Sequence, residues 1–315
     1  REAVGRFGRL ESSKSSIGAS ARLMLAHSLQ QLGDLEAARS AYRNAKANAE
    51  SDQAVEVSIG LVQVLIDLGR LDEAATELSV LPVNGLSDNL IARIDLERGR
   101  LAVLQNEHEN AARILTRLAG RAPAEILDDA RYWLARAQAA NGDHNEAALT
   151  LARALQDDPE SPLRHEMMYQ LGLSLGNAGK YTEACQTLRK LAGEVDGKPI
   201  ASEALLAAAS YAQKSGDATL AEQLSNQAAG GLEGEAALDA AYIAAESAYK
   251  REDYQSAAHA FTRLLDDLPY DHKYAASVRY RLGMAFHNLG NAEKAADILE
   301  PLYADAHVDE RYLPG

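Results

Sequence analysis

Three arginines, Arg93, Arg100 and Arg136, recur at related positions of a repeated pattern in the middle of the chain. They stand out because the chain is acidic: its 315 residues include 46 acidic and 32 basic side chains, and its net charge is −14. A guanidinium group binds a carboxylate through two parallel hydrogen bonds. The arginines therefore predict a site for an acidic group of a ligand.

Tyrosines occupy another position of the same pattern, ten residues before the turn of the repeat. Tyr and Trp side chains combine a large apolar surface with a polar tip and are favoured at interfaces. We therefore predict a partner-binding groove that contains the arginines, the tyrosines of this row and one adjacent tryptophan. Its residues are Arg93, Arg100, Arg136, Tyr132, Trp133, Tyr169, Tyr242 and Tyr280. The alternative is that the tyrosines are half-buried packing residues and that the arginines pair with Asp95, Glu97 or Asp129.

Patterns of catalytic and metal sites fail on inspection. His165 and Glu166 begin like the helix of a zinc protease, but Tyr169 occupies the position of the second histidine. The 8 histidines lie far apart in the sequence, with none at metal-ligand spacing on one helix. Cys185 has no histidine near it in the sequence and is interpreted as an unreactive thiol. We expect a non-enzymatic protein without a metal or a cofactor.

Composition excludes several classes of protein. A single cysteine cannot form a disulfide within the chain. No run of about 18 apolar residues occurs, so we expect no direct membrane insertion by this part of the chain. A sequence pI of about 5.1 argues against nucleic acid as a partner, because phosphate contacts need clustered Lys and Arg. A hydrophobic content of 47% is too high for a disordered chain.

The elements that position these residues follow from an internal repeat. Turn-like pairs recur at intervals of 36 to 38 residues. They begin at Gly33, Gly69, Asn106, Gly142, Gly179, Gly216, Glu252 and Gly290. An alanine follows five residues after every turn start, and a large apolar residue follows nine residues after it in every repeat except at Ser225. Seven residues before the turn start the residue is small in every repeat except at Val62.

Each repeat is thus predicted to be a helix, a tight turn and a second helix. Glycine at the turn start supplies a left-handed cap for the first helix. The small residues lie where the two helices would cross, and they permit close approach. One helical pair cannot bury its apolar face alone, so neighbouring pairs must stack.

These rows resemble the tetratricopeptide repeat pattern. The match is clearest where Leu171 and Gly172 are followed by Tyr181, Ala184 and Leu188. The tryptophan expected early in the first helix is absent from every repeat, and the period exceeds 34 residues. The resemblance implies an all-α, right-handed superhelical solenoid of antiparallel helix pairs, with ligands in a concave groove lined by the first helices.

A subgroup of the family grips C-terminal carboxylates through a Lys and Asn pair in the first groove helices. The corresponding positions carry Leu23 and His27 in this sequence, so that activity is not supported.

The pattern predicts three regions. Residues 1–17 are expected to be the second helix of a truncated repeat followed by a polar loop, because Ala3, Phe7 and Leu10 repeat the spacing of the second helices. Residues 18–305 are expected to form eight repeats in one solenoid, and residues 306–315 a C-terminal tail. We therefore expect the chain to be part of a longer protein.

The preferred functional hypothesis is a protein-interaction scaffold that binds a segment of a partner protein in its groove. Arginine outnumbers lysine, which suits a bacterium with a GC-rich genome, and an extracytoplasmic role in envelope assembly or export is slightly favoured over a cytoplasmic one. Two alternatives remain. One is an accessory region of a larger enzyme or of a polysaccharide-export or secretion protein. The other is a structural module that forms homo-oligomers.

Overall fold

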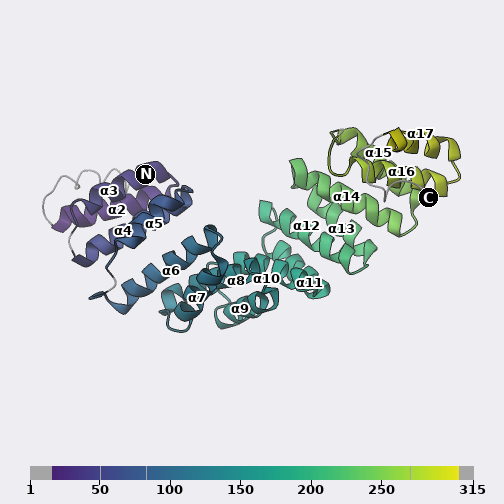
Figure 1. Ribbon diagram of the computed structural model, residues 1–315. Helices are drawn as coiled ribbons and strands as arrows, with labels where there is room; N and C mark the ends of the chain where they lie inside the picture. Colours follow the sequence, from purple (N-terminus) through teal and green to yellow (C-terminus); the bar gives the residue numbers. More distant parts are fainter. Residues whose placement is uncertain (1–15, 50, 83, 270, 305–315) are drawn as a thin grey trace. The chain divides into compact units, whose positions relative to one another are not determined.

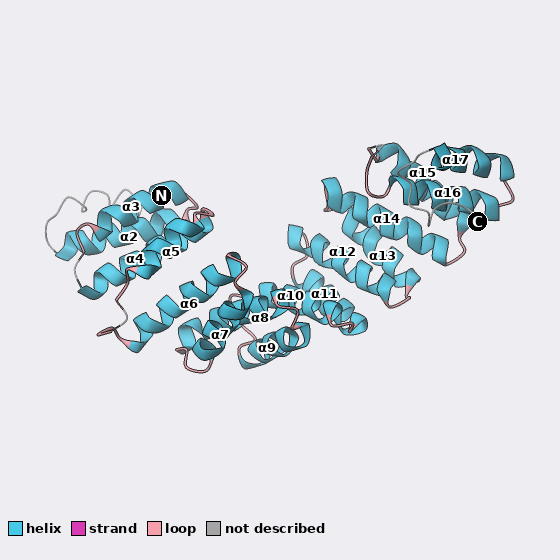
Figure 2. Cartoon of the chain, viewed as in Figure 1, coloured by secondary structure: helices cyan, strands magenta, loops and turns pink. Residues whose placement is uncertain are grey.

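The computed structural model describes residues 16–49, 51–82, 84–269 and 271–304. Within these ranges the chain is all α, with sixteen helices and no strand (Figures 1 and 2). The described part contains no helix with the length and apolar character needed to cross a membrane. The predicted truncated helix near the N-terminus and the predicted C-terminal tail lie outside the described residues.

The chain divides into two compact units, Arg1–Leu163 and Arg164–Gly315. The described helices of the first unit are α2 (Ser16–Gln31), α3 (Leu35–Lys46), α4 (Ser51–Asp67), α5 (Leu71–Ser79), α6 (Asp88–Leu104), α7 (His108–Ala119), α8 (Ala124–Ala140) and α9 (His144–Asp157). Those of the second unit are α10 (Arg164–Asn177), α11 (Tyr181–Glu194), α12 (Pro199–Lys214), α13 (Ala218–Ala229), α14 (Gly234–Lys250), α15 (Tyr254–Asp267), α16 (Ala275–Asn288) and α17 (Ala292–Ala304).

The helices form pairs, each made of an even-numbered helix and the odd-numbered helix that follows it. Within each unit, every helix packs against the next one along the chain (Figure 1). The even-numbered helices also pack on one another, as α4, α6 and α8 do. The predicted all-α solenoid of helix pairs is confirmed.

All eight predicted turn starts adopt the left-handed backbone conformation. Six of them are glycines, with φ between 71° and 89°. The other two are Asn106 and Glu252, each with φ of 62°. The amide of the residue after the turn start bonds back into the first helix, as Glu107 N does to Ala102 O at 2.8 Å. This geometry ends the first helix and reverses the chain.

The small residues stand where the paired helices cross. A Cβ placed on Gly172 would lie 2.4 Å from Cγ of Leu188, and one placed on Gly99 would lie 2.5 Å from Cγ of Leu115. The alanine in the second helix is buried in all eight repeats. Interiors are packed at crystal-like density, so these positions have no room for a larger side chain.

Ser225, which interrupts the large apolar row, borders a cavity. Its hydroxyl donates to the carbonyl of Ala221 at 2.6 Å and so remains within its own helix. A hollow of about 230 Å³ lies beside it, lined also by alanines of α14 and by Leu264 of α15. A serine in place of a leucine is consistent with this hollow.

Candidate functional site

The first helices of three successive repeats, α4, α6 and α8, line a small cavity within the first unit. Its volume is about 160 Å³, and it is lined by Gln63, Arg93, Leu96, Glu97, Arg100, Ile126, Asp129 and Trp133. All of these side chains come from the first helix of a repeat. Because these first helices pack on one another, equivalent positions of successive repeats lie side by side. Three of the predicted groove residues therefore border one cavity: Arg93, Arg100 and Trp133.

The ring of Trp133 makes cation–π contacts with two arginine side chains. The guanidinium carbon of Arg136 lies 4.4 Å from the centroid of the Trp133 ring, and that of Arg100 lies 5.3 Å from it. Tyr132 packs edge-on against Trp133 at 5.7 Å between centroids. A guanidinium over an indole is attracted by the negative face of the ring. The indole thus brings two arginines of adjacent repeats together despite their like charge.

The arginines differ in their acidic partners. Nη2 of Arg100 lies 2.6 Å from Oδ1 of Asp67 and its Nη1 lies 3.9 Å from Oε2 of Glu97. Arg93 pairs with Glu56 at 3.9 Å. In the part of the chain that the structure describes, Arg136 has no carboxylate within 4.0 Å. Of the three predicted groove arginines, Arg136 is therefore the one whose guanidinium is not already neutralised by a carboxylate among the described residues.

Asp95 pairs with two other arginines. Its carboxylate lies 3.4 Å from Nη1 of Arg98 and 2.6 Å from Nη2 of Arg121. Among the acidic residues expected to pair with the groove arginines, Glu97 pairs with Arg100. Asp95 instead pairs with arginines outside the predicted groove.

Glu97 is a buried carboxylate on the wall of the cavity. The residue is 2% exposed, and its Oε1 accepts a hydrogen bond of 2.7 Å from Nε2 of Gln63. Its Oε2 has no hydrogen-bond partner among the described residues. Burial raises the pKa of Glu97, and Asp67 and Asp129 raise it further, against the opposing effects of Gln63 and Arg100. Burial and the neighbouring Asp128 likewise raise the pKa of Asp129.

Several of these residues were not predicted as groove residues. Beside the predicted arginines, the cavity is lined by Gln63, Ile126, the buried Glu97 and the half-buried Asp129. The available signal was spacing: Glu97 is four residues after Arg93 and three before Arg100, so all three share one helix face.

The remaining predicted tyrosines belong to the second unit, where each is half-buried. Tyr169 is on α10, Tyr242 on α14 and Tyr280 on α16. One face of Tyr242 is covered by Tyr274, with 4.3 Å between ring centroids and 2° between ring planes. Its hydroxyl lies 2.9 Å from Oγ of Ser277. Tyr242 therefore joins neighbouring repeats, as the packing alternative expects for a residue of this row.

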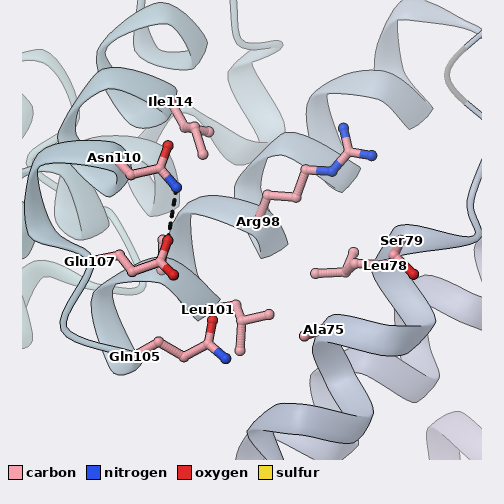
Figure 3. A pocket seen from close by; sticks show the side chains of 10 residues that line it. Ala75, Leu78, Ser79, Arg98, Leu101, Gln105, Glu107, Asn110 and Ile114 are labelled. Atoms are coloured by element: carbon pink, nitrogen blue, oxygen red, sulfur yellow. Dashed lines mark hydrogen bonds between the residues drawn. The ribbon is translucent and has the colours of Figure 1, made fainter.

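A larger cavity of about 280 Å³ lies on another face of α6 (Figure 3). Ala75 and Leu78 of α5 lie on one side of it, and Asn110 and Ile114 of α7 lie on the other. The polar groups at its edge bond to one another: Nδ2 of Asn110 donates to Oε2 of Glu107 at 2.9 Å. None of the described residues that line this cavity carries a buried polar atom without a partner, as Glu97 and Arg100 do, so it is a weaker candidate than the one beside Trp133.

Metal and thiol chemistry find no support in the described geometry. Across residues 16–49, 51–82, 84–269 and 271–304, no group of three or more His, Cys, Asp or Glu side chains is arranged to hold a metal ion. Cys185 is buried on α11, and burial raises the pKa of its thiol, which disfavours the reactive thiolate.

The comparison with known families decides the identity of the repeat. Family models described as tetratricopeptide repeat match residues 29–94, 96–162, 166–195 and 242–307. The chain is a tetratricopeptide repeat protein. Tetratricopeptide repeats form extended binding surfaces, so the family and the fold support a protein-interaction scaffold.

Solved structures with the same fold are numerous but distant in sequence. The apo form of RapI is 12% identical with a TM-score of 0.70, and the match covers 91% of this chain and 88% of RapI. The apo form of the quorum sensor NprR from B. thuringiensis is 14% identical with a TM-score of 0.58, over 90% of this chain and 97% of NprR. NprR in complex with its cognate peptide NprX is 11% identical with a TM-score of 0.50, over 84% and 82%. No curated protein sequence matches this tetratricopeptide repeat protein.

Proposed function

We propose that this tetratricopeptide repeat protein is an interaction scaffold whose first unit binds a segment of a partner protein across α4, α6 and α8. An acidic group of the segment contacts Arg136, and a neighbouring group of the segment packs beside Trp133. The proposal rests on the surroundings of the Arg136 guanidinium. It is oriented by the Trp133 ring at 4.4 Å, and it has no acidic partner among the described residues.

The energetics favour an acid at this place. Stacking on the indole restricts the arginine side chain before the partner arrives, so less conformational entropy is lost on binding. Arg100 lies on the same indole and adds to the local positive potential, although Asp67 offsets part of it. Arginine and tryptophan are the residue types that most often dominate binding energy at interfaces.

The class of partner is supported by the fold. NprR, which shares the fold, is known in complex with its cognate peptide. Stacked helix pairs present continuous side-chain rows to an extended or helical segment. We therefore favour a peptide segment over a small molecule as the occupant of the groove.

Selection from a displayed library of random twelve-residue peptides tests the proposal without a known partner. The wild-type protein should enrich peptides that contain Asp or Glu. The Arg136→Ala variant should bind the enriched peptides at least tenfold more weakly, which corresponds to about 1.4 kcal/mol. The matched control is Arg117→Ala, which removes an exposed arginine from α7 and should leave binding within twofold. Enriched peptides without acidic residues, or equal binding by Arg136→Ala, would contradict the proposal.

We also propose that the binding serves assembly or export at a bacterial envelope. The composition supports the bacterial source, because arginine outnumbers lysine and the chain contains a single cysteine. The envelope role rests on the resemblance to bacterial proteins with such repeat arrays. Fractionation of the source cells with an antibody against the protein tests this part separately. Recovery with the cytoplasmic fraction alone would contradict it.

A further inference from the structure

The cavity beside Trp133 is lined by residues with two complementary polar atoms that lack hydrogen-bond partners, although Oε2 of Glu97 lies 3.9 Å from Nη1 of Arg100. Oε2 of Glu97 is a hydrogen-bond acceptor, and Nε of Arg100 is a donor. Both are buried, both belong to residues that line the cavity, and neither has a hydrogen-bond partner among the described residues. A buried polar atom without a partner costs about 1–3 kcal/mol, so a ligand that satisfies both gains affinity.

The charges that line the cavity balance. Two guanidinium groups, those of Arg93 and Arg100, face two carboxyl groups, those of Glu97 and Asp129. A cationic ligand would meet the arginines and an anionic ligand would meet the acids. A neutral group with its own donor and acceptor would avoid like-charge repulsion from either pair.

The volume of the cavity limits the size of the group that can bind in it. A volume of about 160 Å³ holds about five water molecules at ~30 Å³ each. That is room for a side chain of four or five non-hydrogen atoms lying against the Trp133 ring.

We propose that the cavity between α4, α6 and α8 is a subsite for a carboxamide side chain, an Asn or Gln of the bound segment. Its NH₂ group donates to Glu97 Oε2, and its carbonyl oxygen accepts from the Arg100 guanidinium. The hydrogen bond from Gln63 holds Oε1, which leaves Oε2 as the oxygen available to a ligand. The inference extends the proposed function, because it names a second group of the segment that contacts Arg136.

The single tryptophan of the chain makes the test specific to this site. Protein labelled with 5-fluorotryptophan gives one fluorine resonance, at Trp133, on the wall of the cavity. Propionamide, propionate and propylammonium have similar size and differ in charge, and each is titrated in turn. Propionamide should shift the resonance saturably and bind at least fivefold more tightly than either charged probe.

A cavity variant and an exposed control variant test this inference apart from the acidic contact. In Glu97→Gln, the Gln63 bond keeps the amide oxygen in place and turns an NH₂ donor toward the cavity, so propionamide should bind at least fivefold more weakly. Arg117→Ala, the exposed control on α7, should leave propionamide binding within twofold, so a loss in Glu97→Gln is specific to the cavity. Because propionamide carries no acidic group, its binding is measured separately from the acidic peptides that test Arg136.

Each other outcome overturns the inference. Tighter binding of propylammonium makes the cavity a cation subsite, tighter binding of propionate makes it an anion subsite, and no saturable shift with any probe makes it a water-filled hollow. If Glu97→Gln does not fold, the selectivity of the wild-type protein among the three probes still decides the question.

Discussion

At the scale of the residue, Trp133 explains why two arginines of adjacent repeats lie together. Their guanidinium groups lie 5.3 and 4.4 Å from the ring centroid, on a side chain that attracts cations without carrying a charge. Arg100 also pairs with Asp67, whereas Arg136 has no acidic partner among the described residues. The two arginines therefore differ: Arg100 pairs with a residue of the neighbouring repeat, and we propose that Arg136 contacts the ligand.

Glu97 leads to a prediction about pH. Burial, the largest cause, raises the pKa of the folded carboxyl above its ordinary value of 4.5, so the folded state binds the proton more tightly than the unfolded state. The destabilisation by ionised Glu97 is absent below pH 4.5 and grows as the pH rises through the folded pKa. Glu97→Gln should therefore raise the free energy of unfolding at pH 7, with a gain that vanishes toward pH 4.5.

Urea denaturation at several pH values measures this gain. Glu109→Gln, at an exposed position of α7, is the control and should show no such pH dependence. A gain of equal size at pH 7 and pH 4.5 would show that the ionisation of Glu97 does not affect stability.

At the scale of the element, the turns between paired helices require a left-handed residue. Glu252 adopts φ of 62°, a conformation that costs an ordinary L-residue about 1–2 kcal/mol. Glu252→Gly should therefore stabilise the protein by about 1 kcal/mol in urea denaturation. Asn106→Gly should gain less, because asparagine tolerates this conformation. A loss of stability in Glu252→Gly would contradict the account of these turns.

The helix crossings give a prediction with an internal control. Gly172→Ala places a Cβ 2.4 Å from Cγ of Leu188 and should destabilise the protein by about 1–2 kcal/mol, although alanine is the better helix former. In a Leu188→Ala background the clash is gone, so the same Gly172→Ala change should be neutral or stabilising. Additive free energies of unfolding in this double-mutant cycle would mean that the two side chains do not compete for space.

The sequence was sufficient to predict the helices and turns, but not to predict the cavity or its lining. A left-handed turn start needs glycine or asparagine at most positions, and a close crossing needs a small residue, so both leave a mark in one chain segment. The environment of Glu97 leaves no such mark, because it depends on Gln63, Asp129 and Trp133 from two other helices. The stack on Trp133 was anticipated only as a cluster of residue types, since the direction of a side chain is not encoded in spacing.

At the scale of the whole molecule, we propose that the repeats between residues 18 and 305 form one array. Repeats in such an array are stabilised through their nearest neighbours, so a local defect spreads along it. Leu188→Ala, in the second unit, should lower the midpoint of thermal unfolding seen by circular dichroism. It should also lower the midpoint seen by the fluorescence of Trp133, which lies in the first unit. A tryptophan transition unaffected by Leu188→Ala would show that the two units unfold independently.

The proposed binding of an acidic segment is tested most directly by titrating one selected acidic peptide into the protein and following the emission of its single tryptophan. We predict a saturable change in Trp133 emission. The affinity should fall at least tenfold when Arg136 is replaced by alanine, or when the acidic residue of the peptide is replaced by its amide. Full affinity in both cases, with no change in the emission of Trp133, would contradict the account.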